Sequence, residues 1–197
     1  MLFGENICDP RPTTVARVLL DEVGPSGQPP PKHSAHRPVA TPKTSSKADT
    51  ETITRARLIE NLNEDLAREY QAIIAYVVYS QAIKGAPYMS IAKELEVHAG
   101  EELAHALTIA QQIDYLGGEI TTIPKPVKTS DDAKEMLRFD LENEAQTLRA
   151  YRQRVRECET LGEFAIAEHV REIMIQEQDH LIALATALGE DPPDVSG

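Results

Sequence analysis

The sequence is poor in aromatic residues and in cysteine: its 197 residues include no Trp, three Phe, six Tyr and two Cys. Cys8 and Cys158 lie far apart and form no Cys-x-x-Cys pair, which argues against a disulfide framework and favours a reducing compartment. No apolar run reaches about 18 residues, so no membrane-spanning helix is expected. The N-terminus lacks a basic region followed by an apolar stretch, so we expect a cytoplasmic protein without a secretory signal.

Positive charge is also scarce over most of the chain. Residues 49–197 contain 14 Lys and Arg against 28 Asp and Glu, a net charge of −14, whereas residues 1–48 carry +2. An acidic body attracts cations and argues against a general nucleic-acid binder.

The composition predicts three segments. Residues 1–50 form a mostly flexible extension, because residues 24–50 are rich in Pro, Ser, Thr and Gly and cannot bury enough apolar surface to offset chain entropy. Residues 51–189 form a helical domain, and residues 190–197 form a tail. Four helices are predicted, at 52–84, 88–116, 130–160 and 163–188. Ser130 is expected to cap the third helix and Thr160 the fourth.

The lengths of the connections predict the topology. The first and third connections are short, so the helices form two antiparallel hairpins. The middle connection, residues 117–129, contains two prolines and is expected to be extended. At about 3.3 Å per residue it spans roughly 43 Å, which is also the length of a helix of about 29 residues. We therefore predict an all-α four-helix bundle with a long crossover between its second and third helices.

Six polar residues interrupt the apolar stripes near the middle of the helices. Two Glu-x-x-His pairs lie on separate helices, and each is preceded by another Glu 33 residues before its own Glu. This repetition indicates an internal duplication of a helical hairpin. The six residues are Glu69, Glu102, His105, Glu144, Glu177 and His180.

These residues form the ligand set of a di-metal centre. Four carboxylates in a dry core would repel one another and cost several kcal/mol each in desolvation. No Lys or Arg lies beside them on the helix seams, whereas two divalent ions supply four positive charges. Residues three apart share a helix face, so the Glu and His of one pair can reach the same ion. Mixed Glu and His ligation suits two iron or two manganese ions per chain, and such a site can also take zinc.

Five further residues on these helices are assigned other roles. His98, one turn before the second-helix ligands, is interpreted as a supporting residue or part of an access route, with a further metal ligand or a polar core residue as the alternatives. Tyr76 is interpreted as core packing, with an electron donor or hydrogen-bond partner of the centre as the alternative. Glu101 is expected on the solvated surface, and Tyr151 and Cys158 are expected only to fill the core.

Several segments carry a family resemblance: LNEDLAREYQAIIAY, EELAHA, LGGEI before the proline-containing crossover, EMLRFDLENEAQTL and QEQDHL. Through them residues 55–189 resemble the ferritin-like superfamily, and bacterioferritin in particular. The resemblance implies a ferritin-like bundle in which the six residues hold or bridge two irons. It also implies oxidation of Fe²⁺ by O₂ or H₂O₂ for iron storage or detoxification, and it places Tyr76 beside the centre.

The chain departs from these families at particular positions. Leu103 stands where bacterioferritins have their haem-ligand Met, so haem is not expected. Only Glu190 to Gly197 follow Gly189, so the fifth helix of a 24-subunit shell is not expected. A homo-oligomer, dimer or larger, is expected by analogy. Thr147 replaces a further Glu of rubrerythrins, and no rubredoxin-type cysteine pairs occur.

Two alternative functions use the same scaffold. One is a peroxidase or oxidase of the rubrerythrin or manganese-catalase type. The other is a DNA-protection stress protein whose basic tail, with Lys32, Arg37, Lys43 and Lys47, holds phosphate. The acidic body opposes DNA binding. The partners that the resemblance implies are Fe²⁺ with O₂ or H₂O₂.

Overall fold

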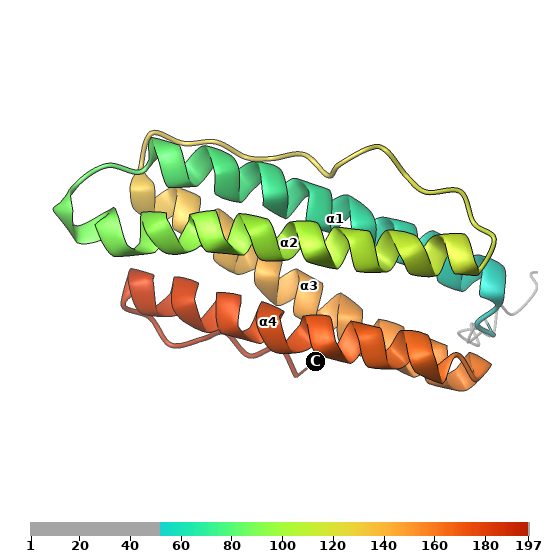
Figure 1. Ribbon diagram of the computed structural model, residues 1–197. Helices are drawn as coiled ribbons and strands as arrows, with labels where there is room; N and C mark the ends of the chain where they lie inside the picture. The colour runs from blue at the N-terminus through green and yellow to red at the C-terminus, as the bar shows by residue number, and fades with distance from the viewer. Residues whose placement is uncertain (1–51, 197) are drawn as a thin grey trace, which may run out of the picture. The chain divides into compact units, whose positions relative to one another are not determined.

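A computed structural model describes residues 52–196 as a bundle of four long helices (Figure 1). These are α1 (Arg55–Ala82), α2 (Met89–Tyr115), α3 (Ala133–Leu161) and α4 (Phe164–Leu188), and a short 3₁₀ helix, η1 (Ala86–Tyr88), precedes α2. Residues 52–196 contain no strand. The predicted all-α bundle is confirmed, and no helix end lies more than three residues from its predicted position. The predictions for the N-terminal extension fall outside the described residues.

The helix ends differ in detail from the sequence prediction. Asp132 caps α3 by accepting a hydrogen bond from the Glu135 N–H, so the prediction of Ser130 as the cap is wrong. Thr160 lies inside α3, where its hydroxyl donates to a main-chain carbonyl one turn earlier, and so it does not cap α4. Gly162 ends α3 with a φ of 76°, a left-handed conformation that favours glycine.

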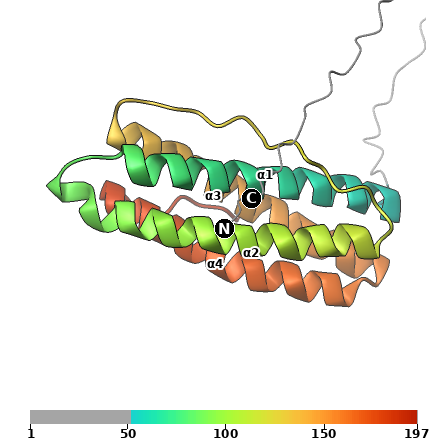
Figure 2. The same cartoon turned by 45° about the horizontal axis from the view of Figure 1, so that its top comes forward.

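The connection between α2 and α3 runs along the outside of α1, as both views show (Figures 1 and 2). Hydrogen bonds join the two segments in the same chain order, so the connection runs parallel to α1. The bonded pairs are Asn63 with Glu119, Ala67 with Lys125, Gln71 with Pro126 and Tyr79 with Lys128. The predicted crossover is therefore confirmed, and α3 begins at the same end of the bundle as α2.

Two groups of buried apolar side chains fill the two ends of the bundle. One contains Tyr79, Leu95 and Leu137, and the other contains Leu62 and Ile109, with further residues from all four helices in each. Between these groups lies a layer of buried polar side chains. The bundle thus surrounds a polar layer with apolar packing on both sides, which keeps water away from it. None of the helices in residues 52–196 has the length and apolar character needed to cross a membrane.

Candidate metal centre

The structure brings all six predicted ligands together in the central layer. Glu69 comes from α1 and Glu144 from α3, while α2 and α4 each contribute one Glu-x-x-His pair. Every one of the six residues is at most 2% exposed. The helices converge at this layer because each carries its polar residues near its midpoint, and midpoints of helices of similar length meet in either orientation.

The donor atoms form two overlapping groups of potential ligands. Glu69 and His105 belong to one group, Glu144 and His180 belong to the other, and Glu102 and Glu177 belong to both. Within each group, one donor atom from each residue lies within 4.8 Å of the others. The arrangement fits two ions that share two carboxylates, each ion having one further carboxylate and one imidazole of its own.

The two histidines point the same ring nitrogen into the centre. His105 Nδ1 lies 3.0 Å from Glu177 Oε1, and His180 Nδ1 lies 2.9 Å from Glu102 Oε1. Their outward nitrogens contact the opposite helix: His105 Nε2 is 2.9 Å from Gln176 Oε1, and His180 Nε2 is 2.8 Å from Glu101 Oε2. Partners of this kind fix the orientation of a metal-ligating imidazole.

Two roles predicted from the sequence need correction here. Glu101 is about one-third exposed (34%) and contacts His180, so its interpretation as a mere surface residue is wrong. Tyr151 does more than fill the core, because its hydroxyl donates a hydrogen bond to Glu69. Tyr76 fits the alternative to plain packing, since its hydroxyl donates to Glu144. Cys158 is buried in the apolar core, as expected.

His98 lies beside the centre without belonging to either central group. Its ring stacks on that of His180 with 4.0 Å between centroids, and it meets the Tyr76 ring edge-on at 5.3 Å. Burial lowers the pKa of His98 to about 3, so the ring is neutral at physiological pH. With Glu101 and His180 it forms a third, outer group of potential ligands. Its supporting role stays a prediction.

Protons balance the charge of the centre when no metal is present. Burial raises the pKa of Glu102 to about 8 and, together with repulsion from Glu177, raises that of Glu144 well above its ordinary 4.5. Burial alone would lower the pKa of His180, but the adjacent carboxylates of Glu102 and Glu177 outweigh it and raise the value to about 11. The pKa of His105 is raised in the same way.

Unsatisfied buried atoms also point to metal. Eight buried side-chain nitrogen and oxygen atoms in the described residues have no hydrogen-bond partner, and five of them belong to the six predicted ligands. Some are close to opposite charges, such as His180 Nδ1 at 2.9 Å from Glu102 Oε1, but they are not aligned as hydrogen bonds. Buried polar atoms normally find a partner, so lone pairs that converge without one fit a bound cation.

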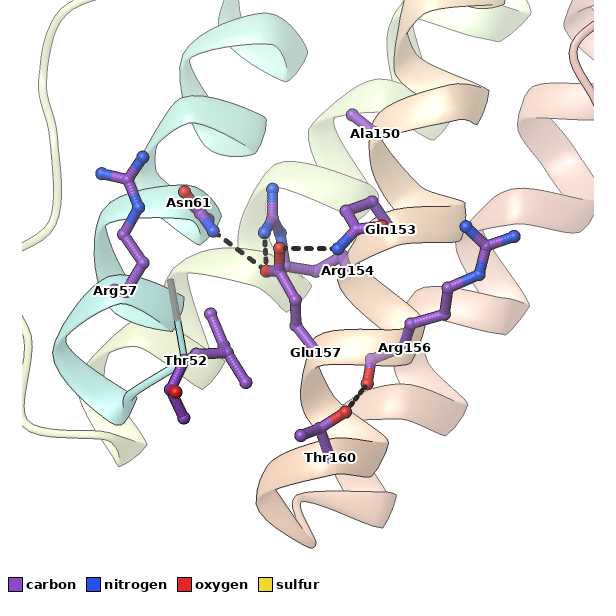
Figure 3. A pocket seen from close by; sticks show the side chains of 10 residues that line it. Thr52, Arg57, Asn61, Ala150, Gln153, Arg154, Arg156, Glu157 and Thr160 are labelled. Carbon is purple, nitrogen blue, oxygen red and sulfur yellow. Dashed lines mark hydrogen bonds and ion pairs between the residues drawn. The ribbon is translucent and has the colours of Figure 1, made fainter. Parts of the chain in front are cut away.

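One buried cation near the centre was missed by the sequence analysis. Arg154 is 5% exposed and donates to Asp65 over 2.6 Å and also to Glu157. Asp65 lies one helical turn before the predicted ligand Glu69 on α1. Asn61 and Gln153 donate to the same Glu157 at the wall of a surface pocket of about 620 Å³ (Figure 3). Because Arg154 pairs with two carboxylates of its own, it does not neutralise the carboxylates of the six predicted ligands.

Comparison with known sequences identifies relatives of one kind. A family model described as a ferritin-like domain matches residues 59–192. A bacterioferritin from Desulfovibrio desulfuricans is 31% identical over 128 residues, which cover 64% of this chain and 72% of that protein. A bacterioferritin from Brucella melitensis is 26% identical over 134 residues, which cover 67% of this chain and 83% of that protein.

Solved structures give the same result. A protein from Bacillus anthracis, described as ferritin-like and diiron-carboxylate, is 34% identical with a TM-score of 0.66, and the match covers 68% of this chain and 96% of that one. The bacterioferritin of Rhodobacter capsulatus is 27% identical with a TM-score of 0.63, covering 68% and 84%. That structure is described as having a metal-free dinuclear site and a haem iron. The predicted ferritin-like type of bundle is thereby confirmed.

Proposed function

The chain belongs to the ferritin-like family, and on that premise we propose that it is a di-iron ferroxidase. It takes two Fe²⁺ ions as substrate at the six ligands and oxidises them to Fe³⁺ with O₂ or H₂O₂, for iron storage or detoxification. The observation that carries this proposal is the pair of overlapping ligand groups that share Glu102 and Glu177. A single-ion site needs no second group.

The ligand chemistry supports iron. Carboxylate and imidazole together suit iron and manganese, and four anionic ligands favour the higher charge of Fe³⁺ over that of Fe²⁺. Glu69 and Glu144 are each held by a tyrosine hydroxyl, which fixes one carboxylate oxygen and leaves the other directed inward. The apolar groups at both ends of the bundle limit access of bulk water to the reaction.

The reaction balances without any other reductant. Two Fe²⁺ ions give up one electron each. O₂ takes both electrons with two protons and leaves as H₂O₂, and H₂O₂ used as oxidant takes two electrons and two protons and leaves as two waters. The six residues hold both ions close to one another, so that a single oxidant can take both electrons.

Two single substitutions test the proposal. Glu69→Ala and Glu144→Ala should each abolish rapid Fe²⁺ oxidation, followed optically under O₂, while circular dichroism shows a folded helical bundle. The matched control is Glu142→Ala, because Glu142 is exposed on the same helix as Glu144 and pairs only with Lys128. Oxidation at the wild-type rate in both site variants would show that these carboxylates hold no reacting iron.

Elemental analysis of the purified protein separates the remaining possibilities. Near two irons per chain, with fast Fe²⁺ turnover and no haem spectrum, is the expected result. Two manganese ions, or bound iron without Fe²⁺ turnover, would favour the peroxidase or oxidase instead.

The homo-oligomer also remains a proposal, supported by exposed apolar side chains such as Val77, Leu103 and Ile123 on α1, α2 and the crossover. The DNA-binding tail falls outside the described residues.

A further inference from the structure

The centre is built from two halves related by a constant offset in the sequence. Each of the three ligands on α1 and α2, and Tyr76 beside them, has a counterpart of the same type 75 positions later, on α3 or α4. The pairs are Glu69 with Glu144, Tyr76 with Tyr151, Glu102 with Glu177 and His105 with His180. If only these residues mattered, the two metal positions would be equivalent.

The two halves differ at the residues that contact the Nε2 atoms of the two histidines. Glu101 on α2 contacts His180 on α4, and Gln176 on α4 contacts His105 on α2, over 2.8 Å and 2.9 Å. Glu101 and Gln176 are themselves 75 positions apart. The two contacts are therefore the same contact made twice, once with a carboxylate and once with a neutral amide.

This difference changes the donor strength of the two histidines. A neutral imidazole that offers Nδ1 to a metal carries its proton on Nε2, so Nε2 donates the outer hydrogen bond. A charged acceptor makes that bond stronger and pushes electron density towards Nδ1, which binds the ion more strongly. Glu101 gives His180 such an acceptor, whereas Gln176 offers His105 only an amide oxygen.

We infer that the two metal positions are unequal, the ion held by Glu144 and His180 being bound more tightly than the ion held by Glu69 and His105, because Glu101 rather than a glutamine supports His180. The inference rests on the proposed di-metal function. Glu101 and Gln176 act as positioning residues, since they reach the ions only through the histidines. Filling of the site should then be ordered, with the His180 position filled first.

Solvent limits the size of the effect. Glu101 is about one-third exposed (34%) and Gln176 is exposed, so water screens part of the carboxylate charge. Loss of an outer partner of a metal-bound histidine typically costs about 10-fold to 100-fold in affinity. For this partly screened contact we expect the lower end of that range, about tenfold.

Exchanging the two residues separates their roles from general stability. Co²⁺ is the probe, titrated into the metal-free protein without O₂ and followed by its visible absorption and by calorimetry. Glu101→Gln should weaken the tight site about tenfold and bring the two affinities together. Gln176→Glu should leave the tight site unchanged and strengthen the weak site about tenfold. The double exchange should restore two unequal sites, with the order reversed.

A control variant and the pattern of Co²⁺ binding distinguish failure of this inference from failure of the proposed function. Glu96→Gln, which removes a charge from the exposed face of α2, should leave both Co²⁺ affinities unchanged. Two bound Co²⁺ per chain with affinities that neither exchange alters would overturn the inequality but leave the di-metal site standing. A gain in affinity from Gln176→Glu is not expected from a residue that merely supports the fold. Wild-type protein that binds no Co²⁺ would overturn both the proposed function and this inference.

Discussion

Metal loading should displace protons from the centre, so pH should act differently on the metal-free and the loaded protein. In the metal-free state the carboxylates around His180 raise its pKa from 6.5 to about 11, and burial raises that of Glu102 from 4.5 to about 8. At a pH between the unfolded and the folded pKa of either group, the folded chain holds a proton that the unfolded chain has released. A raised pKa adds stability that is lost as pH rises, so the metal-free fold should weaken from neutral to alkaline pH.

The size of the effect follows from proton linkage. One extra proton in the folded state changes the free energy of unfolding by about 1.4 kcal/mol per pH unit. His180 contributes this slope from its unfolded value of 6.5 up to about 11, and His105 adds a slope of the same sign. At about 3 °C per kcal/mol for a domain of this size, the melting temperature should fall by about 4 to 8 °C per pH unit. Glu69 has a lowered pKa and acts only in acid.

The loaded protein should behave otherwise, because metal ligands must be deprotonated to bind. The affinity for a divalent ion therefore rises with pH, and the stability gained from binding rises with it. The assay is thermal unfolding by circular dichroism at about pH 7, 8 and 9, with chelator and with saturating Zn²⁺, which has no redox chemistry. The melting temperature should fall with pH in chelator and stay level or rise in Zn²⁺.

Two variants tie the slope to the centre. His180→Gln should reduce the slope of the metal-free protein by about 1.4 kcal/mol per pH unit. His169→Gln should not change it, because His169 is exposed on the same helix and outside both ligand groups. Equal slopes with and without Zn²⁺, or a metal-free stability that does not change between about pH 7 and 9, would refute the argument that protons and metal ions exchange at this site.

Two further predictions concern the surroundings of the centre. Arg154→Met should lower the free energy of unfolding in urea by less than the about 3 to 5 kcal/mol typical of a buried charge left unpaired, because Glu157 loses its cation but Asp65 keeps its ion pair with Arg68. Full stability in this variant would mean that Arg68 alone neutralises Asp65 and that Glu157 needs no counter-charge. Tyr76→Phe should cost about 1 kcal/mol through the lost hydrogen bond to Glu144 but still bind two Zn²⁺ per chain. Binding of only one Zn²⁺ would instead make the tyrosine necessary for holding the second ion.

The sequence predicted the bundle and its six central residues because both depend on helical periodicity. A Glu in an apolar stripe is visible without knowledge of the neighbouring helices, and so is the repeat of 33 residues. The crossover was predictable for a similar reason, since the length of an extended chain can be compared with that of a helix. These features are properties of one segment at a time.

The supporting contacts were not predictable, because they depend on the rotation and register of helices against one another. Glu101 is adjacent to a ligand and should face away from the seam, yet it reaches His180 on the next helix. Tyr151 lies in an apolar stripe, where a tyrosine usually only packs. One signal could have identified it: the offset of 75 residues places Tyr151 at the position equivalent to Tyr76.

The same offset shows where the two halves differ and why. Asp65 and Asp140 are equivalent and both buried, but only Asp65 pairs with arginines, because the positions equivalent to Arg154 and Arg68 are Tyr79 and Asn143. The Tyr79 hydroxyl donates instead to the crossover at Lys128. Asp140 Oδ2 has no hydrogen-bond partner, and burial raises its pKa well above 3.8.

One half therefore neutralises its aspartate with a cation, and the other with a proton. The crossover explains part of this difference, since it runs along α1 and meets Tyr79, whereas Arg154 lies on α3 and meets Asp65 on α1. Two ions bound as proposed would impose the same demand on the inner ligands of both halves, which agrees with the match between those residues. The outer residues meet different surroundings in each half, and both Arg154 and Glu101 mark where the symmetry of the repeat is lost. Among these differences, the exchange of Glu101 for Gln176 lies closest to the proposed ions, and it gives the inferred inequality of the two metal positions.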